Sequence, residues 1–396
     1  MGAEPMMKTL LGGKDAAYFE QRTALLTATE IAQQPELWNE LADMLQERAG
    51  EISSFLGQVL AVPGLRIVFT GAGSSAFIGE MAAALVGREK GLRAECVHTT
   101  DIVSSPESCL FDVPTLLVSF ARSGDSPESV GTIEYARKKI HNLYNLVITC
   151  GKGSHLDRCA TTLPDTLSLL MPARSCDQGF AMTSSVSCML LAAWAAFHYQ
   201  ELDKAVGDIR ALSAKMALQL DSIALAAEEL AKAGYDRLIF LGSGAMKGLA
   251  HEGAIKSLEL SHGQVNTNYD SATGFRHGPK TVLCDSAVTV HFLSSDPFSR
   301  RYDEDLCREL IAERKGNKVV LVGEKGTSGI ESADMKVCYE LPQMALPKEA
   351  GALVASLLFA QCLGLQKSLA LGITTDNPCP QGDVNRVVKG VTVYDL

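Results

Sequence analysis

A loop rich in hydroxyl side chains is the part of the sequence best suited to hold an anion. Val118-Ser-Phe-Ala-Arg-Ser-Gly-Asp-Ser-Pro-Glu-Ser129 runs from an apolar, β-branched segment into a helical one. Ser126 is placed to cap a helix that begins at Pro127, so backbone amides and the positive end of a helix dipole would face the loop. Arg122 and Ser123 would add a charged fork and a hydroxyl, which together suit a monophosphate. The competing interpretation is an ordinary hydroxyl-rich turn.

A glycine loop lies earlier in the chain, Thr70-Gly-Ala-Gly-Ser-Ser-Ala76. Ser74 and Ser75 could close the phosphate cradle from a neighbouring strand end. The loop also nearly matches the GxGxxA pattern of dinucleotide sites, for which Glu89 or Glu95 would be the acid that binds the ribose. Two glycines after a strand equally indicate a tight strand-to-helix turn.

Three charged side chains share one stripe of a predicted helix over Ala250–Ser261. Glu252 and Lys256 are four residues apart, and Lys256 and Glu259 are three apart. A glutamate beside a bound sugar phosphate could act as a general base. A solvated ion-pair face is the alternative.

A histidine stands between glycines in Gly274-Phe-Arg-His-Gly-Pro-Lys280. A short loop of this kind favours an exposed proton donor or acceptor at His277 over a packed core residue, although a histidine satisfied within the turn is also consistent with the pattern. The other histidines show no metal-ligand spacing, so we expect no metal and no other cofactor.

The elements that must position these residues come from an internal repeat. Arg66–Ser74 matches Arg237–Ala245 with both glycines aligned, at an offset of 171 residues. Two further pairs of apolar segments follow at an offset of 172: Leu116–Phe120 with Val288–Phe292, and Asn145–Thr149 with Asn317–Leu321. Strands that alternate with helical segments predict βαβ units and parallel sheets.

The fold class is therefore α/β, with two tandem doubly wound parallel-sheet domains and a helical N-terminal segment. The predicted segments are 1–44 (helical), 45–205 (first domain), 215–375 (second domain) and 376–396 (tail). A helix over 205–233 should bridge the domains, and a short strand is expected at Val391–Tyr394.

Ligands of open parallel sheets bind beyond the carboxyl ends of the strands, where the hydroxyl-rich loop and the glycine loop lie. The corresponding loop of the second copy, Ser294–Phe298, has an acid and no arginine, so it should hold phosphate poorly.

Composition excludes several classes of protein. The 36 Lys and Arg against 46 Asp and Glu give a net charge of -10 without a basic run, which argues against nucleic acid. Eleven cysteines in no CxxC spacing favour reduced, mostly buried thiols and a cytoplasmic location. The N-terminus resembles no signal peptide, and the longest apolar run, Val186–Phe197, is too short to cross a bilayer, so we expect a soluble protein with no membrane partner.

Several separated motifs resemble one family. The loop Ser119–Ser129, the helix residues Lys256 to Glu259, the turn Phe275-Arg-His-Gly-Pro279 and the terminal Val388–Val393 are similar to the isomerase half of glucosamine-6-phosphate synthase, in the sugar isomerase (SIS) superfamily. Thr27–Trp38 and Ser119–Ser129 are similar to the AgaS-type proteins, which are known as tagatose-6-phosphate ketose/aldose isomerases and as galactosamine-6-phosphate deaminase/isomerases.

The resemblance implies roles for individual residues. It makes Ser74, Ser123 and Ser126 phosphate ligands and Glu259 the base that transfers a proton. It assigns ring opening to His277, in its own or a neighbouring subunit's site, which implies a homodimer or a higher homo-oligomer. Lys256 and Lys389 would lie at the reactive end of the sugar, and the tail would cover the active site.

The resemblance also implies an activity. With no glutaminase domain as an ammonia source, release of ammonia from galactosamine 6-phosphate, giving tagatose 6-phosphate, is favoured over ammonia-dependent synthesis. Plain aldose-ketose isomerisation is the near alternative. A sugar-phosphate sensor without turnover and a nicotinamide-dependent oxidoreductase are the rivals from other classes; Glu259, His277 and Lys389 argue against the first, and the lack of a glycine at position 76 argues against the second.

Overall fold

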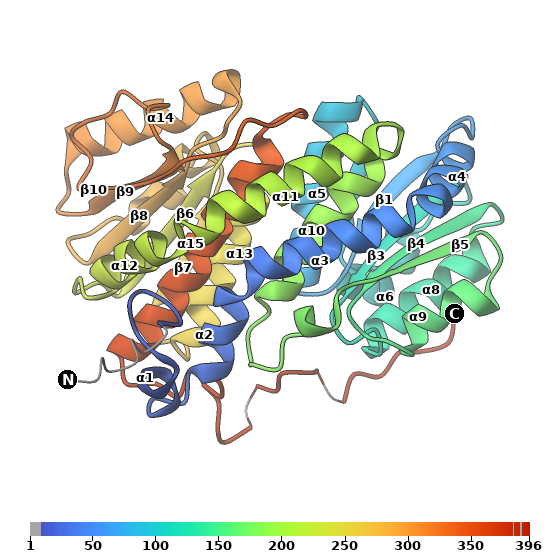
Figure 1. Cartoon of the computed structure of the whole chain (residues 1–396), viewed down its shortest axis with the longest axis horizontal. Helices are drawn as coiled ribbons and strands as arrows, with labels where there is room; N and C mark the ends of the chain where they lie inside the picture. Colours follow the sequence, from blue (N-terminus) through green and yellow to red (C-terminus); the bar gives the residue numbers. More distant parts are fainter. Residues whose placement is uncertain (1–8, 383, 389) are drawn as a thin grey trace, which may run out of the picture.

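The part of the chain described by the computed structural model, residues 9–382, 384–388 and 390–396, forms two parallel β-sheets of five strands each (Figure 1). The first sheet contains β1 (Arg66–Thr70), β2 (Ala94–Cys96), β3 (Thr115–Ala121), β4 (Leu143–Thr149) and β5 (Thr166–Leu170). The second contains β6 (Arg237–Gly242), β7 (Asn266–Asp270), β8 (Ala287–Phe292), β9 (Lys318–Glu324) and β10 (Met335–Tyr339). The predicted α/β class with two parallel sheets is confirmed.

The two sheets repeat one topology. The strand orders are β2-β1-β3-β4-β5 and, in the same direction, β7-β6-β8-β9-β10. The register repeats as well, because Phe69 pairs with Val118 in the first sheet and Phe240 pairs with Val290 in the second. These pairs are separated by the offsets found in the sequence, so the internal repeat is a structural duplication.

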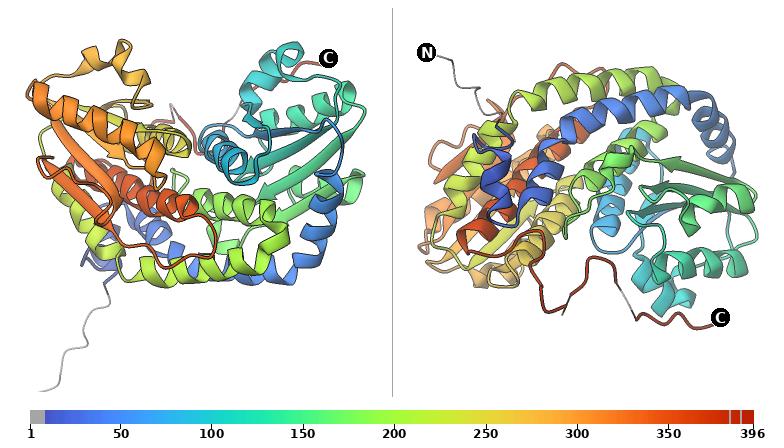
Figure 2. Two further views of the ribbon diagram at one scale, coloured as in Figure 1. Left: turned by 90° about the horizontal axis from the view of Figure 1, so that it is seen from above. Right: turned by 60° about the horizontal axis from the view of Figure 1, so that its bottom comes forward.

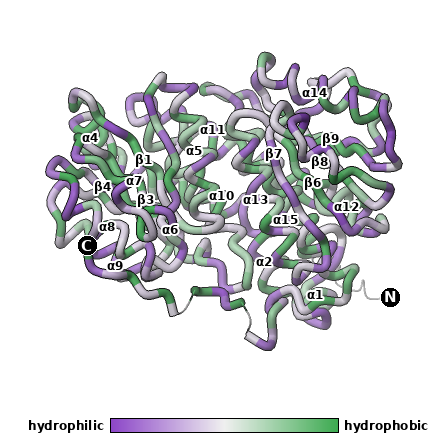
Figure 3. Tube along the Cα trace, turned by 180° about the vertical axis from the view of Figure 1, so that it is seen from behind, coloured by the Kyte–Doolittle hydropathy of each residue, from purple (hydrophilic) through white to green (hydrophobic). Residues whose placement is uncertain are grey.

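Helices cover both faces of each sheet, which explains the continuous apolar runs of the strands. Those of the first half are α5 (Ser74–Lys90), α6 (Thr99–Ser104), α7 (Pro106–Cys109), α8 (Pro127–Lys139), α9 (His155–Thr162) and α10 (Ser184–Phe197). Those of the second half are α13 (Ala245–Leu260), α14 (Pro297–Glu313) and α15 (Glu349–Ala370). Short 3-10 turns lie at Ala173–Ser175, Tyr199–Glu201, Gly274–Arg276 and Pro279–Val282. Figure 3 shows hydrophobic residues concentrated in the strands and hydrophilic residues in the outer loops.

The N-terminal helices pack across both halves. They are α1 (Ala16–Glu20), α2 (Leu25–Ala32), α3 (Gln34–Glu47) and α4 (Ala49–Val59). In α3, Gln34 donates to Gln361 of α15 at 2.7 Å, and the Trp38 indole donates to Ser187 of α10 at 3.0 Å. One hydrophobic cluster contains buried residues of both halves, including those of α10 and α15. The two sheets are therefore joined through a common core.

The connection between the halves differs from the prediction of one helix. Residues 205–233 contain two, α11 (Leu202–Ala217) and α12 (Leu220–Ala231). The chain breaks between them at Gln219, whose side chain donates to the carbonyls of Lys215 and Glu340. Helix α11 lies along α3, and α12 packs against α15.

Two helices from different halves meet at the centre of the molecule. In the left view of Figure 2, α5 and α13 lie side by side between the sheets. A Cβ atom added to Gly248 of α13 would lie 2.9 Å from the Met81 backbone nitrogen of α5. The absence of a side chain at Gly248 therefore permits this close approach.

The C-terminal tail crosses from the second half to the first (Figure 1). Asp376 accepts hydrogen bonds from the backbone nitrogens of Leu26 at 2.9 Å and Thr27 at 2.8 Å, which fixes the start of the tail on α2. The predicted strand at Val391–Tyr394 is wrong, because this segment has no regular structure. It lies along α8, where Tyr135 donates to the carbonyl of Tyr394, and so it has no neighbouring strand to pair with.

Helix α15 was not recognised from the sequence. By length and composition it could cross a membrane, yet 94% of its most apolar window is buried inside the fold. Its place beside α12 and α13 is that of a core helix. The shorter run Val186–Phe197 lies in α10 and is buried, as predicted.

Candidate active site

The hydroxyl-rich loop joins β3 to α8 with the geometry that the sequence predicts. Ser126 is the N-cap of α8, with extended φ and ψ of -65° and 139°, and Pro127 is the first helical residue. The Ser126 hydroxyl accepts from the Ser129 backbone nitrogen and donates to the Ser129 hydroxyl at 2.8 Å. Gly124 has a φ of +73°, and a Cβ there would meet the Ser154 hydroxyl at 2.1 Å, so glycine is required for this turn.

The glycine loop places two serines at the start of α5. Gly73 has a φ of +55°, and a Cβ at Gly71 would lie 2.6 Å from the Ser75 carbonyl carbon. The tight strand-to-helix turn is therefore real. Ser74 and Ser75 are the first two residues of α5 and are 6% and 5% exposed.

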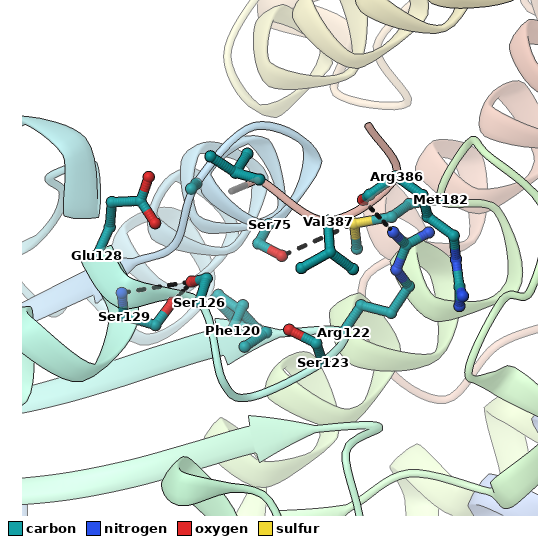
Figure 4. A pocket seen from close by; sticks show the side chains of 13 residues that line it. Ser75, Phe120, Arg122, Ser123, Ser126, Glu128, Ser129, Met182, Arg386 and Val387 are labelled. Atoms are coloured by element: carbon teal, nitrogen blue, oxygen red, sulfur yellow. Dashed lines mark hydrogen bonds between the residues drawn. The ribbon is translucent and has the colours of Figure 1, made fainter. Parts of the chain in front are cut away.

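A pocket forms where the two loops meet, under the C-terminal tail (Figure 4). Ser75, Arg122, Ser123 and Ser126 line it, so four of the five predicted phosphate residues share one cavity. Ser74 is not among the lining residues. The pocket is completed by Ala72, Phe120, Ala121, Glu128, Ser129, Met182, Arg386, Val387 and Val388.

Arg122 is a buried cation without a paired carboxylate. Its side chain donates to the carbonyl oxygens of Arg386 at 2.8 Å and Phe180 at 3.5 Å, and it takes part in none of the ion pairs within the described part of the chain. Burial lowers the pKa of Arg122, and the nearby Arg386 guanidinium lowers it further. Because a buried charge without a paired carboxylate is costly, Arg122 indicates an anionic ligand in this pocket.

The sequence analysis expects the tail to cover the site, but it missed Arg386 and Glu128 as parts of this pocket. Arg386 lies 264 residues from Arg122 in the chain and donates to the carbonyl of Asp177, and no spacing pattern indicates either contact. Glu128, in the first turn of α8, is 6% exposed and has one carboxylate oxygen buried without a hydrogen-bond partner. Its carboxylate would limit the cavity on the side away from Arg122 (Figure 4).

The charged stripe of α13 is buried, so the alternative of a solvated ion-pair face is wrong. The side chains of Glu252 and Lys256 are 0% and 1% exposed, whereas that of Glu259 is 30% exposed. The Lys256 ammonium lies 2.7 Å from Glu259 and 3.7 Å from Glu252. Glu259 is thus the member of the stripe that a ligand can reach, and the buried Lys256 ammonium forms an ion pair with its carboxylate.

The pKa values of the stripe follow from this burial. Burial raises the pKa of Glu252 to about 7, although Lys256 and the Ser74 hydroxyl lower it in part. Burial alone would lower the pKa of Lys256, but the Glu252 and Glu259 carboxylates outweigh burial and raise it. Lys256 therefore stays an ammonium ion at neutral pH and places a positive charge beside the Glu259 carboxylate.

The charged stripe of α13 lies near the two hydroxyl-bearing loops. Ser74 is close enough to Glu252 to lower its pKa, and Arg122 is close enough to Lys256 to lower its pKa. An anion held by the β3–α8 loop would therefore lie near the Lys256–Glu259 pair. This arrangement can bind a phosphate at one end and exchange a proton at the other.

Like Ser74, the predicted residues Lys256, Glu259 and His277 do not line this pocket. His277 is exposed, in the turn after Gly274–Arg276, and does not line the pocket of its own chain. The exposed setting agrees with the sequence analysis, and its catalytic role stays a prediction. Lys389 lies outside the described residues, next to Val388, which lines the pocket.

The equivalent loop of the second sheet is filled by a carboxylate of the chain. Glu349, 2% exposed, accepts from the Ser294 hydroxyl at 2.8 Å, from the Ser295 backbone nitrogen at 2.8 Å and from the Ser295 hydroxyl. An acid thus occupies the hydroxyls and amide that a phosphate would need. This contact explains physically why the second loop is unsuited to phosphate.

The two glutamates proposed to bind the ribose of a dinucleotide do not support that alternative. Glu89 is buried and accepts from the Trp194 indole at 3.0 Å. Glu95 pairs with Arg66 at 2.6 Å. The Glu89 carboxylate is therefore buried away from any ligand, and the Glu95 carboxylate is engaged in a surface ion pair. Among the described residues, no group of three His, Cys, Asp or Glu side chains could hold a metal ion.

Comparison with known proteins identifies the family. The SIS domain model matches residues 60–199. An AgaS protein of Streptomyces coelicolor is 42% identical over 94% of this chain and 96% of its own length. The D-galactosamine-6-phosphate deaminase AgaS of a Shewanella species is 38% identical over 96% of this chain and 94% of its own length. The crystal structure of tagatose-6-phosphate ketose/aldose isomerase from Escherichia coli superposes with a TM-score of 0.84 and 34% identity, over 93% of this chain and 96% of that one. The chain therefore belongs to the AgaS family of SIS-domain enzymes.

Proposed function

We propose that the protein is a deaminating isomerase that converts galactosamine 6-phosphate to tagatose 6-phosphate and ammonia. The observation that carries the proposal is the proximity of the buried Arg122, which has no paired carboxylate, to the Lys256–Glu259 pair. Relatives named as galactosamine-6-phosphate deaminases support the choice of substrate.

The substrate's phosphate would bind in the pocket between the two loops. Ser75, Ser123, Ser126 and Arg122 supply hydroxyl and guanidinium donors, together with the amino end of α8. Ser74, which the resemblance makes a ligand, would act from beside Glu252. Binding energy from this remote anion orients the reacting carbons.

Ring opening would use His277 of a neighbouring subunit. His277 is exposed on its own subunit and lies outside that subunit's pocket, so a second copy is the natural recipient. We therefore propose a homodimer or a higher homo-oligomer, soluble and cytoplasmic, with no nucleic-acid or membrane partner.

Proton transfer would follow at Glu259. Its carboxylate removes the proton from C2 of the open-chain aldehyde and returns it to C1, through an enolamine. The resulting imine at C2 takes up water and releases ammonia, which leaves the ketone of tagatose 6-phosphate. Lys256 or Lys389 would stabilise the oxygen that gains negative charge at C1. No cofactor enters this sequence.

Plain isomerisation of tagatose 6-phosphate is the second candidate. The same proton shuttle would interconvert the C2 ketone of tagatose 6-phosphate and an aldose with a hydroxyl at C2, and the structural relative from Escherichia coli is named for that activity. The two reactions differ only in whether nitrogen leaves.

A substrate panel with the purified full-length protein separates the candidates. Ammonia and ketose phosphate would be measured with galactosamine 6-phosphate and glucosamine 6-phosphate, and aldose formation with tagatose 6-phosphate. Ammonia release that is faster with the galacto sugar supports the deaminase. Isomerisation without ammonia release from either amino sugar would support the isomerase, and no turnover of any of the three would favour a sensor.

A further inference from the structure

Where the two halves of the molecule meet, away from the pocket, one carboxylate contacts two histidines. Glu80 of α5 lies 3.1 Å from His98 Nε2, just before α6. The same carboxylate lies 3.2 Å and 3.3 Å, through its two oxygens, from His251 Nδ1 of α13. Each side chain is about one quarter exposed or less. Glu80 therefore ties α5 to a helix of the other half and to the loop that leads into α6.

Aromatic packing holds one of the histidines in place. The His251 ring lies between Phe77 of α5, at a centroid distance of 3.6 Å, and Tyr269 of β7, at 3.7 Å and 12° between planes. Three residues earlier on α13, Gly248 approaches the backbone of Met81. The seam is thus closely packed here, and the Glu80–His251 contact has a defined geometry.

The contacts of Glu80 with His98 and His251, here called the bridge, join the two helices that carry the halves of the proposed site. Helix α5 begins with Ser74 and Ser75, and Glu80 lies in its second turn. Helix α13 carries Glu259, and His251 directly precedes Glu252 on it. Glu80 lines another surface than the phosphate pocket, so it can act on the reaction only by fixing the two helices relative to each other.

We infer that Glu80 is a positioning residue, which through His98 and His251 keeps the Glu259 helix in register with the phosphate-binding helix. The inference rests on the proposed function. A small shift of α13 against α5 would move the Glu259 carboxylate relative to C2 of a sugar anchored by its phosphate, and misplacement by about 1 Å can cost up to roughly a hundredfold in rate.

The charges at the bridge set its pH range. Burial would raise the pKa of Glu80, but hydrogen bonds and charge from His251 and His98 lower it to about 2, and Glu80 raises the pKa of His98. The stability that ionised Glu80 contributes to the fold is present above pH 4.5, its ordinary pKa, and is lost as pH falls toward 2. The stability that protonated His98 contributes is present below pH 6.5, its ordinary pKa, and is lost as pH rises through the raised pKa.

Other titratable groups face the bridge: Glu95 and Cys96 of β2, Asp101 of α6, Lys247 of α13, and Tyr269 and Asp270 of β7.

The test compares Glu80→Gln with Glu95→Gln in the full-length protein. Glu95 is a matched control, because it borders the same surface but pairs with Arg66 inside one sheet. For Glu80→Gln we expect kcat on galactosamine 6-phosphate to fall about tenfold, while KM and inhibition by inorganic phosphate stay within about twofold. The loss should be largest near pH 5 to 6.5, and Glu95→Gln should match wild type.

Hydrogen exchange of the α5 and α13 amides gives a readout independent of turnover. Both helices should exchange faster in Glu80→Gln than in wild type or Glu95→Gln. Unchanged exchange, an unchanged kcat, or equal losses in both variants would overturn the inference. If wild type turns over no sugar, the proposed function fails, and the exchange data still decide whether the bridge holds the helices. If Glu80→Gln does not fold, His98→Asn, which removes one of the two contacts, takes its place.

Discussion

At the scale of single residues, Arg122 shows most directly what the pocket is built to hold. It is 8% exposed, and its described hydrogen bonds go to the carbonyls of Arg386 and Phe180. A phosphate would replace these weak partners by a charge-assisted contact. The pocket therefore gains most from a ligand with a doubly charged oxyanion.

Arg122→Gln should weaken binding more than catalysis. Loss of a hydrogen bond to a charged group costs about 2 kcal/mol, or roughly thirtyfold in KM, with kcat changed by about threefold at most. Steady-state kinetics and the inhibition constant of inorganic phosphate measure this. The exposed Arg137 of α8 offers a matched control, Arg137→Gln. Equal kinetics for the two variants would mean that Arg122 holds no phosphate.

Glu252 should make stability depend on pH. Burial raises its pKa to about 7 from 4.5, so between these values the folded state binds more protons than the unfolded state, and the free energy of unfolding falls as pH rises. Glu252→Gln removes this titration. The variant's free energy of unfolding minus that of wild type should therefore increase from pH 5 to pH 8, as measured by urea denaturation. A difference that does not change with pH would show that Glu252 does not titrate in this range.

At the scale of elements, the repeat could be predicted and the burial of α13 could not. The matched strands, the N-cap at Ser126 and the turn at Gly71 depend on local patterns, and the structure confirms them. Glu252 and Lys256 lie at spacings that suit an exposed ion-pair face equally well. Only the packing of α5 and α15 against α13 decides that they are buried, and this packing depends on contacts between distant parts of the chain.

Gly248→Ala should separate the two halves of the site. The added Cβ would lie 2.9 Å from backbone and side-chain atoms of Met81, so α13 must move away from α5. We expect kcat to fall about tenfold or more, because Glu259 moves relative to the anchored phosphate. Gly207→Ala is the control, since Gly207 lies in α11 where an added Cβ would meet open space, and alanine favours a helix. Full activity of Gly248→Ala would argue against a site assembled across the two helices.

At the scale of the whole molecule, the tail was predicted to cover the active site, with Lys389 as its one assigned residue, but the three tail residues that line the pocket were not predicted. Val387, Val388 and Arg386 line the pocket from a segment more than 250 residues away from the loop in sequence. The tail has no strand because it lies on α8 and not on a sheet edge. Contacts of an irregular segment follow no periodicity, so the contacts of Arg386, Val387 and Val388 with the pocket could not be predicted from the sequence.

Subunit complementation tests whether His277 acts in a neighbouring subunit. Neither His277→Asn nor Glu259→Gln should turn over substrate alone. Co-expressed in equal amounts, half of the dimers would be mixed, each with one intact site, so activity should return to roughly a quarter of wild type. Light scattering would establish the oligomer first. Mixed dimers without activity would place His277 at the site of its own subunit.

The most direct test of the account is ammonia release from galactosamine 6-phosphate by wild type and by Glu259→Gln. Glu229→Gln, an exposed glutamate of α12, is the control. We predict release by wild type and by the control, and a loss of at least a thousandfold in Glu259→Gln with phosphate binding retained, because a general base and its position together supply about that factor. Ammonia release by Glu259→Gln at the wild-type rate would contradict the account, because another group would then move the C2 proton.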